Sequence, residues 1–161
     1  MNRWILIADA SRARLFREHP ARTPYQLIEA FDHPDSRARA RDLTSDANGR
    51  KPVGPSAGGA YGARSVSLGA HGRVGVAPDT EPKEVEAQKF ARELADRLAH
   101  ARAQNAFDEV VIVCPPHFLG VVRGALDGQV SKHVAAWIDK DLTRERDADV
   151  ERHVRDALQP R

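Results

Sequence analysis

Acidic side chains and one histidine follow apolar runs that have the length of strands, a placement that could support hydrolysis. Asp9 directly follows the first run, Asp139 and Asp141 follow the last one, and His117 follows another run after two prolines. Carboxylates gathered at one end of a sheet can bind Mg²⁺ for phosphodiester hydrolysis. The same side chains also suit helix capping and loop hydrogen bonds. They do not complete a nuclease set, so we predict no metal site and no cofactor and keep the four only as candidate catalytic residues.

Cys114 is the only cysteine of the chain, which excludes an internal disulfide and a zinc site built from several thiolates. It lies three residues before His117, so a thiol–histidine pair is one interpretation. The other is a buried, unreactive thiol, because Cys114 ends an apolar run. The sequence contains no Walker loop, no GxGxxG motif and no HExxH motif.

Positive charge is concentrated in residues 36–78, which we call the basic segment. It holds seven Lys or Arg residues and two Asp residues, a net charge of +5, whereas the whole chain carries +2 and the remainder therefore −3. Eight of the eleven glycines lie there as well. Arginine neutralises phosphate and glycine lets backbone N–H groups approach it, so we predict anion binding, with a solvated loop that binds nothing as the alternative. The predicted binding residues are Arg37, Arg39, Arg41, Arg64, His71 and Arg73.

Three strands precede the basic segment. Residues 4–8 form a continuous apolar run typical of a central strand, residues 13–18 a second strand after a short link, and residues 25–31 a third. Short links between them predict an antiparallel meander. Residues 32–79 show no sustained apolar period, which indicates a long inserted loop.

Helices and strands alternate after this loop. Thr80 is expected to cap a helix that runs to about Gln104, and residues 110–114 read as a buried strand. A short helix over residues 117–126, a strand over 135–138 and a terminal helix capped by Asp147 follow.

This order predicts an α/β fold. Strands joined through helices run parallel with right-handed crossovers, so the meander and two crossover units give a five-stranded mixed sheet of order 3-2-1-4-5 with flanking helices. This is a ribonuclease-H-like arrangement. The length of 161 residues suits one domain, interrupted by a loop at about 32–79.

Four stretches resemble the bacterial family named "protein required for attachment to host cells". They occur in order along nearly the whole chain, as WILIADASRARLF at residues 4–16, KFARELA at 89–95, VCPPHFLG at 113–120 and IDKDLT at 138–143. The family name implies a role in attachment, which we interpret as a phenotype and not as a mechanism.

That family in turn resembles the middle domain of archaeal and eukaryotic peptide release factors. The resemblance implies a ribosome or RNA setting, because the release-factor loop carries the Gly-Gly-Gln motif that promotes peptidyl-tRNA hydrolysis. Here Gly58 and Gly59 are followed by Ala60, and the one Gly-Gln pair, Gly128-Gln129, follows a different helix. The hydrolytic activity is therefore not carried over.

The sequence favours a non-catalytic binding module for RNA or the translation machinery that acts through the basic segment. The alternative is a hydrolase on nucleic acid or peptidyl-tRNA that uses Asp9, His117, Asp139 and Asp141. The first apolar run is too short for a signal peptide, and no run approaches the ~20 residues of a membrane span, so we expect a cytoplasmic protein without a membrane partner. The strand at residues 25–31 should be a sheet edge that needs protection, which makes a homodimer possible; the alternative is that the long loop folds back over this strand.

Overall fold

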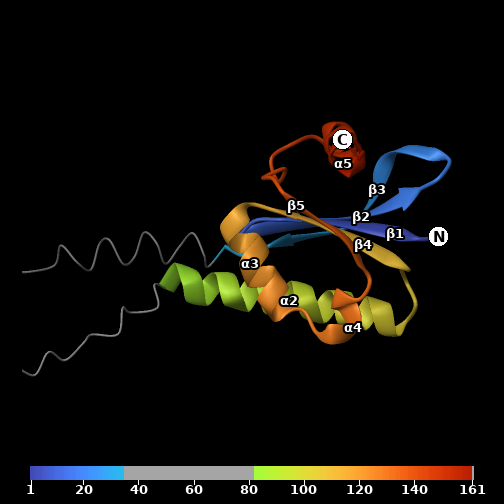
Figure 1. Ribbon diagram of the computed structural model, residues 1–161. Coiled ribbons are helices and arrows are strands. Elements are labelled where there is room, and N and C mark those ends of the chain that lie inside the picture. The colour runs from blue at the N-terminus through green and yellow to red at the C-terminus, as the bar shows by residue number, and fades with distance from the viewer. Residues whose placement is uncertain (35–81, 161) are drawn as a thin grey trace, which may run out of the picture.

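Five strands form one sheet in the computed structural model, which describes residues 1–34 and 82–160 (Figure 1). The strands are β1 (Arg3–Ala8), β2 (Arg12–His19), β3 (Arg22–Asp32), β4 (Glu109–Cys114) and β5 (Val134–Asp139). The helices are α2 (Pro82–Ala103), α3 (Pro116–Ala125), α4 (Gly128–Ser131) and α5 (Asp147–Leu158).

The sheet has the order β3-β2-β1-β4-β5, which confirms the predicted order. β1, β2 and β3 pair antiparallel, whereas β4 pairs parallel with both β1 and β5. Ile5 in the central strand lies between Phe16 of β2 and Val111 of β4, and all three side chains are fully buried. The continuous apolar runs of β1 and β4 thus reflect burial on both faces.

Helices cover both faces of the sheet. Alternate residues of β1 point to opposite sides, so Leu6 packs in the core under α2 and α3, and Ile5 packs in the core under α5. Figure 1 shows α2, α3 and α4 on one face and α5 on the other. Within the described ranges, no helix is long and apolar enough to cross a membrane.

Two local predictions need correction. The structure contains α4, which the sequence did not predict because four residues are too few to show a helical period. Its cap is Asp127, whose carboxylate accepts a hydrogen bond of 2.7 Å from the backbone N–H of Val130. Asp147 is not the cap of α5: Arg146 holds that position without a side-chain cap bond, and Asp147 is the first helical residue. The predicted cap Thr80 lies outside the described residues.

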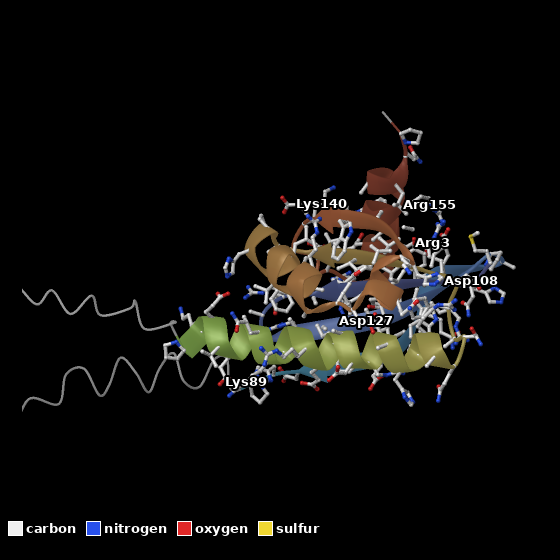
Figure 2. The ribbon with its side chains drawn as sticks, turned by 60° about the horizontal axis from the view of Figure 1, so that its bottom comes forward. Arg3, Lys89, Asp108, Asp127, Lys140 and Arg155 are labelled. Atoms are coloured by element: carbon white, nitrogen blue, oxygen red, sulfur yellow. The ribbon has the colours of Figure 1, made fainter. Side chains whose placement is uncertain are left out.

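The parallel strands β1, β4 and β5 end at one edge of the sheet, which we call the carboxyl edge. β3 also ends there, and α2 begins there (Figure 1). The ring of His33, just past β3, lies 2.9 Å from a carboxylate oxygen of Glu86 in α2 and stacks on Phe90 with the ring centroids 5.2 Å apart. These contacts hold the two described flanks of residues 35–81 next to each other. Figure 2 brings the face with α2 forward, with Lys89 nearer the carboxyl edge and Arg3 and Asp108 toward the opposite edge.

Candidate functional site

Asp9 shapes the turn at the end of β1. Its Oδ1 atom accepts hydrogen bonds from the backbone N–H groups of Ser11 and Arg12, both at 2.8 Å, and from the Ser11 hydroxyl at 3.0 Å. The backbone N–H of Asp9 donates to the carbonyl of Arg12 at 2.9 Å. An aspartate is suited to this turn, because its short carboxylate reaches the N–H groups that follow it. One oxygen of Asp9 is thus committed to the backbone of the β1–β2 link.

Thr143 brings Asp9 and Asp141 together. Its hydroxyl lies 2.9 Å from Oδ2 of Asp9 and 2.7 Å from Oδ1 of Asp141, and the side chain is buried. Asp141 Oδ1 also accepts the backbone N–H of Thr143 at 3.1 Å. Since a hydroxyl carries one hydrogen, Thr143 donates to one carboxylate at a time. One buried hydroxyl therefore joins the turn after β1 to the connection between β5 and α5.

Asp139 and His117 lie apart from this pair of carboxylates. Asp139 is the last residue of β5, opposite Cys114 in the register, and its side chain is exposed without a hydrogen bond or ion pair to any described residue. His117 instead pairs with Glu84 of α2. Within residues 1–34 and 82–160, no group of three or more His, Cys, Asp or Glu side chains is arranged to hold a metal ion.

Cys114 is buried and unsuited to nucleophilic attack. Burial raises the pKa of its thiol to about 12, and the nearby charges of Asp9 and Asp141 act in the same direction, against a hydrogen bond with the backbone of Ala8 that lowers the pKa. A thiol must ionise before it can attack, so Cys114 stays unreactive at neutral pH. Of the two interpretations of Cys114, the structure supports the buried, unreactive thiol.

A groove of about 550 Å³ runs between α2 and α3. At one end, Nε2 of His117 lies 2.7 Å from Oε2 of Glu84, and the histidine side chain is 76% exposed. Each helix contributes residues about one turn apart. The lining includes Glu84, Gln88 and Arg92 from α2 and His117, Gly120 and Gly124 from α3.

Arg14 of β2 fixes the connection between β5 and α5. Its Nη1 atom lies 2.7 Å from the Asp147 carboxylate, and Nη2 donates to the carbonyls of Leu142 at 2.8 Å and Glu145 at 2.9 Å. Nη2 also lies 3.2 Å from the Thr143 carbonyl. A planar guanidinium can satisfy several such acceptors at once, so Arg14 holds in place the connection that carries Asp141 and Thr143.

Comparison with known proteins identifies the family. The family model "Protein required for attachment to host cells" matches residues 4–154. The chain belongs to this family. The resemblance predicted from the sequence is thereby confirmed, whereas no curated protein matches the chain.

Among solved structures, an archaeal translation termination factor, aRF1, is similar to this family member. The identity is 13% and the TM-score is 0.42. The similarity covers 98% of this chain and 39% of the factor, so the chain spans well under half of that protein's length.

The predicted binding residues lie outside the part of the chain that the structure describes; they are Arg37, Arg39, Arg41, Arg64, His71 and Arg73. The sequence did not single out Thr143, Arg14 or the pairing of Glu84 with His117. Glu84 was visible only as an acid in the first turn of a helix, and Thr143 only as part of a family stretch. Asp141 lies two positions before Thr143, but the other partners, such as Asp9 for Thr143 and Glu84 for His117, lie 33 to 134 positions away, where no spacing rule applies.

Proposed function

We propose that this family member is a non-catalytic binding module for RNA, including the RNA of the translation machinery, and that the basic segment makes the main contact. The observation that carries the proposal is the charge distribution: residues 36–78 hold a net +5, against −3 for the rest of the chain. Clustered Lys and Arg bind nucleic acid by neutralising phosphates and releasing counterions. A local excess of positive charge favours a local polyanionic partner.

The position of the flanks supports this proposal. β3 ends and α2 begins at the carboxyl edge, where His33 and Glu86 are in contact at 2.9 Å. The chain therefore leaves the described fold and re-enters it at this edge of the sheet, beside the ends of β1, β4 and β5. Binding residues are often presented in this way, by a connection anchored on a rigid sheet.

The hydrogen bonds of the acidic residues also favour binding over hydrolysis. Asp9 holds the β1–β2 turn through three bonds to Oδ1, and Asp141 shares the Thr143 hydroxyl. Carboxylates engaged in this way have a structural role in the turn and in the connection. Replacing them should lower the stability of the protein more than it weakens the binding of a ligand.

RNA binding is tested by its dependence on salt. We expect the full chain to bind single-stranded RNA with little sequence preference, and the log–log salt slope to be on the order of −0.7 for each phosphate neutralised. Replacing Arg37, Arg39 and Arg41 with alanine should weaken binding and flatten this slope in fluorescence anisotropy titrations.

The matched control replaces three exposed basic residues of the described part with alanine, namely Lys132, Arg146 and Arg152. This variant should bind with nearly the wild-type slope. If both triple variants lose affinity equally, binding reflects overall charge, and if the wild-type chain does not bind RNA at low salt, the proposal fails.

A hydrolase is the second candidate, and the contact between His117 and Glu84 favours it. A carboxylate that accepts the Nε2–H of an imidazole leaves Nδ1 free to act as a base, with the two ring nitrogens in the reverse roles of the Ser-His-Asp triad. The test is cleavage of labelled RNA with and without Mg²⁺. Cleavage by the wild-type chain that disappears in His117→Ala and persists in His133→Ala would favour the enzyme over the binding module.

A further inference from the structure

We infer that the groove between α2 and α3 binds one nucleotide of a single-stranded RNA, with its phosphate on Arg92 and its base against Gly120 and Gly124. The inference rests on the proposed RNA binding, yet it assigns a site separate from the basic segment.

The wall formed by α3 suits a flat ring. Gly120 and Gly124 lie four residues apart on one face of α3, and a Cβ atom built at either would meet no heavy atom within 4 Å. The backbone is therefore exposed to open space, which lets a planar group approach more closely than any side chain would allow. The volume of about 550 Å³ is in the range of small-molecule sites.

Arg92 supplies a positive charge on the wall formed by α2, and no described residue pairs with it. Its side chain is exposed, lines the groove, and makes no hydrogen bond or ion pair with any described residue. The other charged member of this wall, Glu84, already contacts His117 at 2.7 Å. Because guanidinium groups bind phosphate oxygens in pairs, Arg92 is suited to the phosphate of a nucleotide.

Gln88 lies one turn before Arg92 and faces the same groove. Its amide both donates and accepts hydrogen bonds, so it can pair with the polar edge of any base. This combination selects a nucleotide without selecting its base, as expected for a protein that binds RNA with little sequence preference.

The groove is close to the basic segment in the sequence. Glu84, at one end of the groove, lies in the first turn of α2, which directly follows that part of the chain.

The experiment is an NMR titration of the isotope-labelled full chain with AMP and UMP at millimolar concentration. We expect shifts of the backbone amides around Gln88, Arg92, Gly120 and Gly124 with both nucleotides. Inorganic phosphate should shift only the amides near Arg92, and adenosine mainly those of α3. If neither nucleotide shifts the amides of α2 and α3, the assignment is overturned.

Filling the groove provides the decisive variant. Gly124→Leu should abolish the nucleotide shifts while the protein stays folded, because the site is open and leucine favours helix over glycine. Gly128→Leu is the matched control, since a Cβ atom there also meets nothing within 4 Å and Gly128 is not part of the groove lining. Wild-type shifts in folded Gly124→Leu would overturn the inference.

Arg92→Ala should weaken nucleotide binding about tenfold or more, as expected when a charged hydrogen bond is lost, whereas Arg152→Ala should leave it unchanged. Equal weakening by both substitutions would contradict a phosphate contact at Arg92.

The variant lacking Arg37, Arg39 and Arg41 separates the two proposals. If it loses RNA binding but keeps the AMP and UMP shifts, both stand; if the wild-type chain binds these nucleotides in the groove but binds no RNA, the groove stands and the proposed function fails.

Discussion

The Thr143 hydroxyl is a single buried group on which two carboxylates depend. It lies 2.9 Å from Asp9 and 2.7 Å from Asp141, and these residues belong to segments far apart in the sequence. The Asp9 carboxylate is half-buried and that of Asp141 is exposed, so water can partly replace a lost bond, and a hydrogen bond to a charged group contributes at most on the order of 1.5–3 kcal/mol. The geometry of the carboxyl edge is therefore sensitive to one oxygen atom.

Thr143→Val tests this dependence. The substitution keeps the shape of the side chain and removes the hydroxyl, so we expect the free energy of unfolding to fall by about 1–3 kcal/mol in urea denaturation. Thr143→Ser keeps the hydroxyl, so its free energy of unfolding should fall clearly less than that of Thr143→Val. Equal stability of wild type and Thr143→Val would contradict the proposed role of the bridge.

The raised pKa values of two buried side chains, Tyr25 and Cys114, predict that the protein loses stability at alkaline pH. Burial raises the pKa of Tyr25 to about 12 from 10.0, helped by the charges of Glu18 and Glu151, and burial raises that of Cys114 to about 12 from 9.0. The folded state thus holds both protons more tightly than the unfolded state. The stabilisation is complete below pH 9 and is lost as the pH rises from about 9 to about 12, by up to about 1.4 kcal/mol per pH unit for each group.

Urea denaturation at a series of pH values measures this loss. Tyr25→Phe should reduce the slope between pH 10 and 12, and Cys114→Ala should reduce it from pH 9 upward. A wild-type stability that does not fall over this range would contradict the prediction.

At the scale of elements, the connection between β5 and α5 is held by a residue of another strand. Arg14 of β2 binds the Asp147 carboxylate and the carbonyls of Leu142 and Glu145, and its guanidinium carbon lies 5.4 Å from the centre of the Phe16 ring. These contacts fix α5 to the same sheet that α2 covers from the other side.

Arg14→Lys should loosen this connection. A lysine ammonium keeps the charge but cannot reach all of these acceptors in one plane, so we expect a loss of about 2 kcal/mol or more in stability. Hydrogen exchange should become faster in α5 but not in α2, relative to the wild-type chain. Arg146→Lys, at an exposed position, is the control. Equal exchange rates in α5 of the two variants would contradict the role of Arg14.

The sequence predicted elements better than it predicted contacts between them. β1 and β4 were predicted because unbroken apolar runs reflect burial on both faces, and α2 because Phe90, Leu94 and Leu98 recur at helical spacing. The predicted cap of α5 was wrong by one residue: Asp147 is the first helical residue, and its carboxylate pairs with Arg14, a partner 133 positions away. The Thr143 bridge and the groove could not be predicted for the same reason, since both arise where distant segments meet.

At the scale of the whole molecule, β3 is an outermost strand of the sheet, with a neighbouring strand on one side only. Among the described strands only β2 pairs with it, and Leu27 is 44% exposed, one of the two large apolar side chains that the described residues expose. Unpaired backbone groups along an edge strand can pair with another chain. We therefore expect a homodimer in which β3 pairs with β3 of a second copy.

Sedimentation at micromolar concentration tests the dimer. The wild-type chain should sediment at twice the monomer mass of 17.8 kDa. Leu27→Lys should shift it toward monomer, because it places like charges on a shared edge, whereas Lys132→Ala should not. A wild-type chain that sediments only as a monomer would refute the dimer.

The central position of β1 has a consequence for the order in which the molecule folds. β1 meets β2 soon after it is made, but its other neighbour is β4, whose Glu109 pairs with Arg3 across 106 positions. During synthesis, one side of β1 therefore waits for most of the chain to leave the ribosome, and contacts between such distant segments form slowly. Until β4 arrives, the side of β1 that will meet it stays unpaired, and an unpaired apolar strand is a site at which a nascent chain can aggregate.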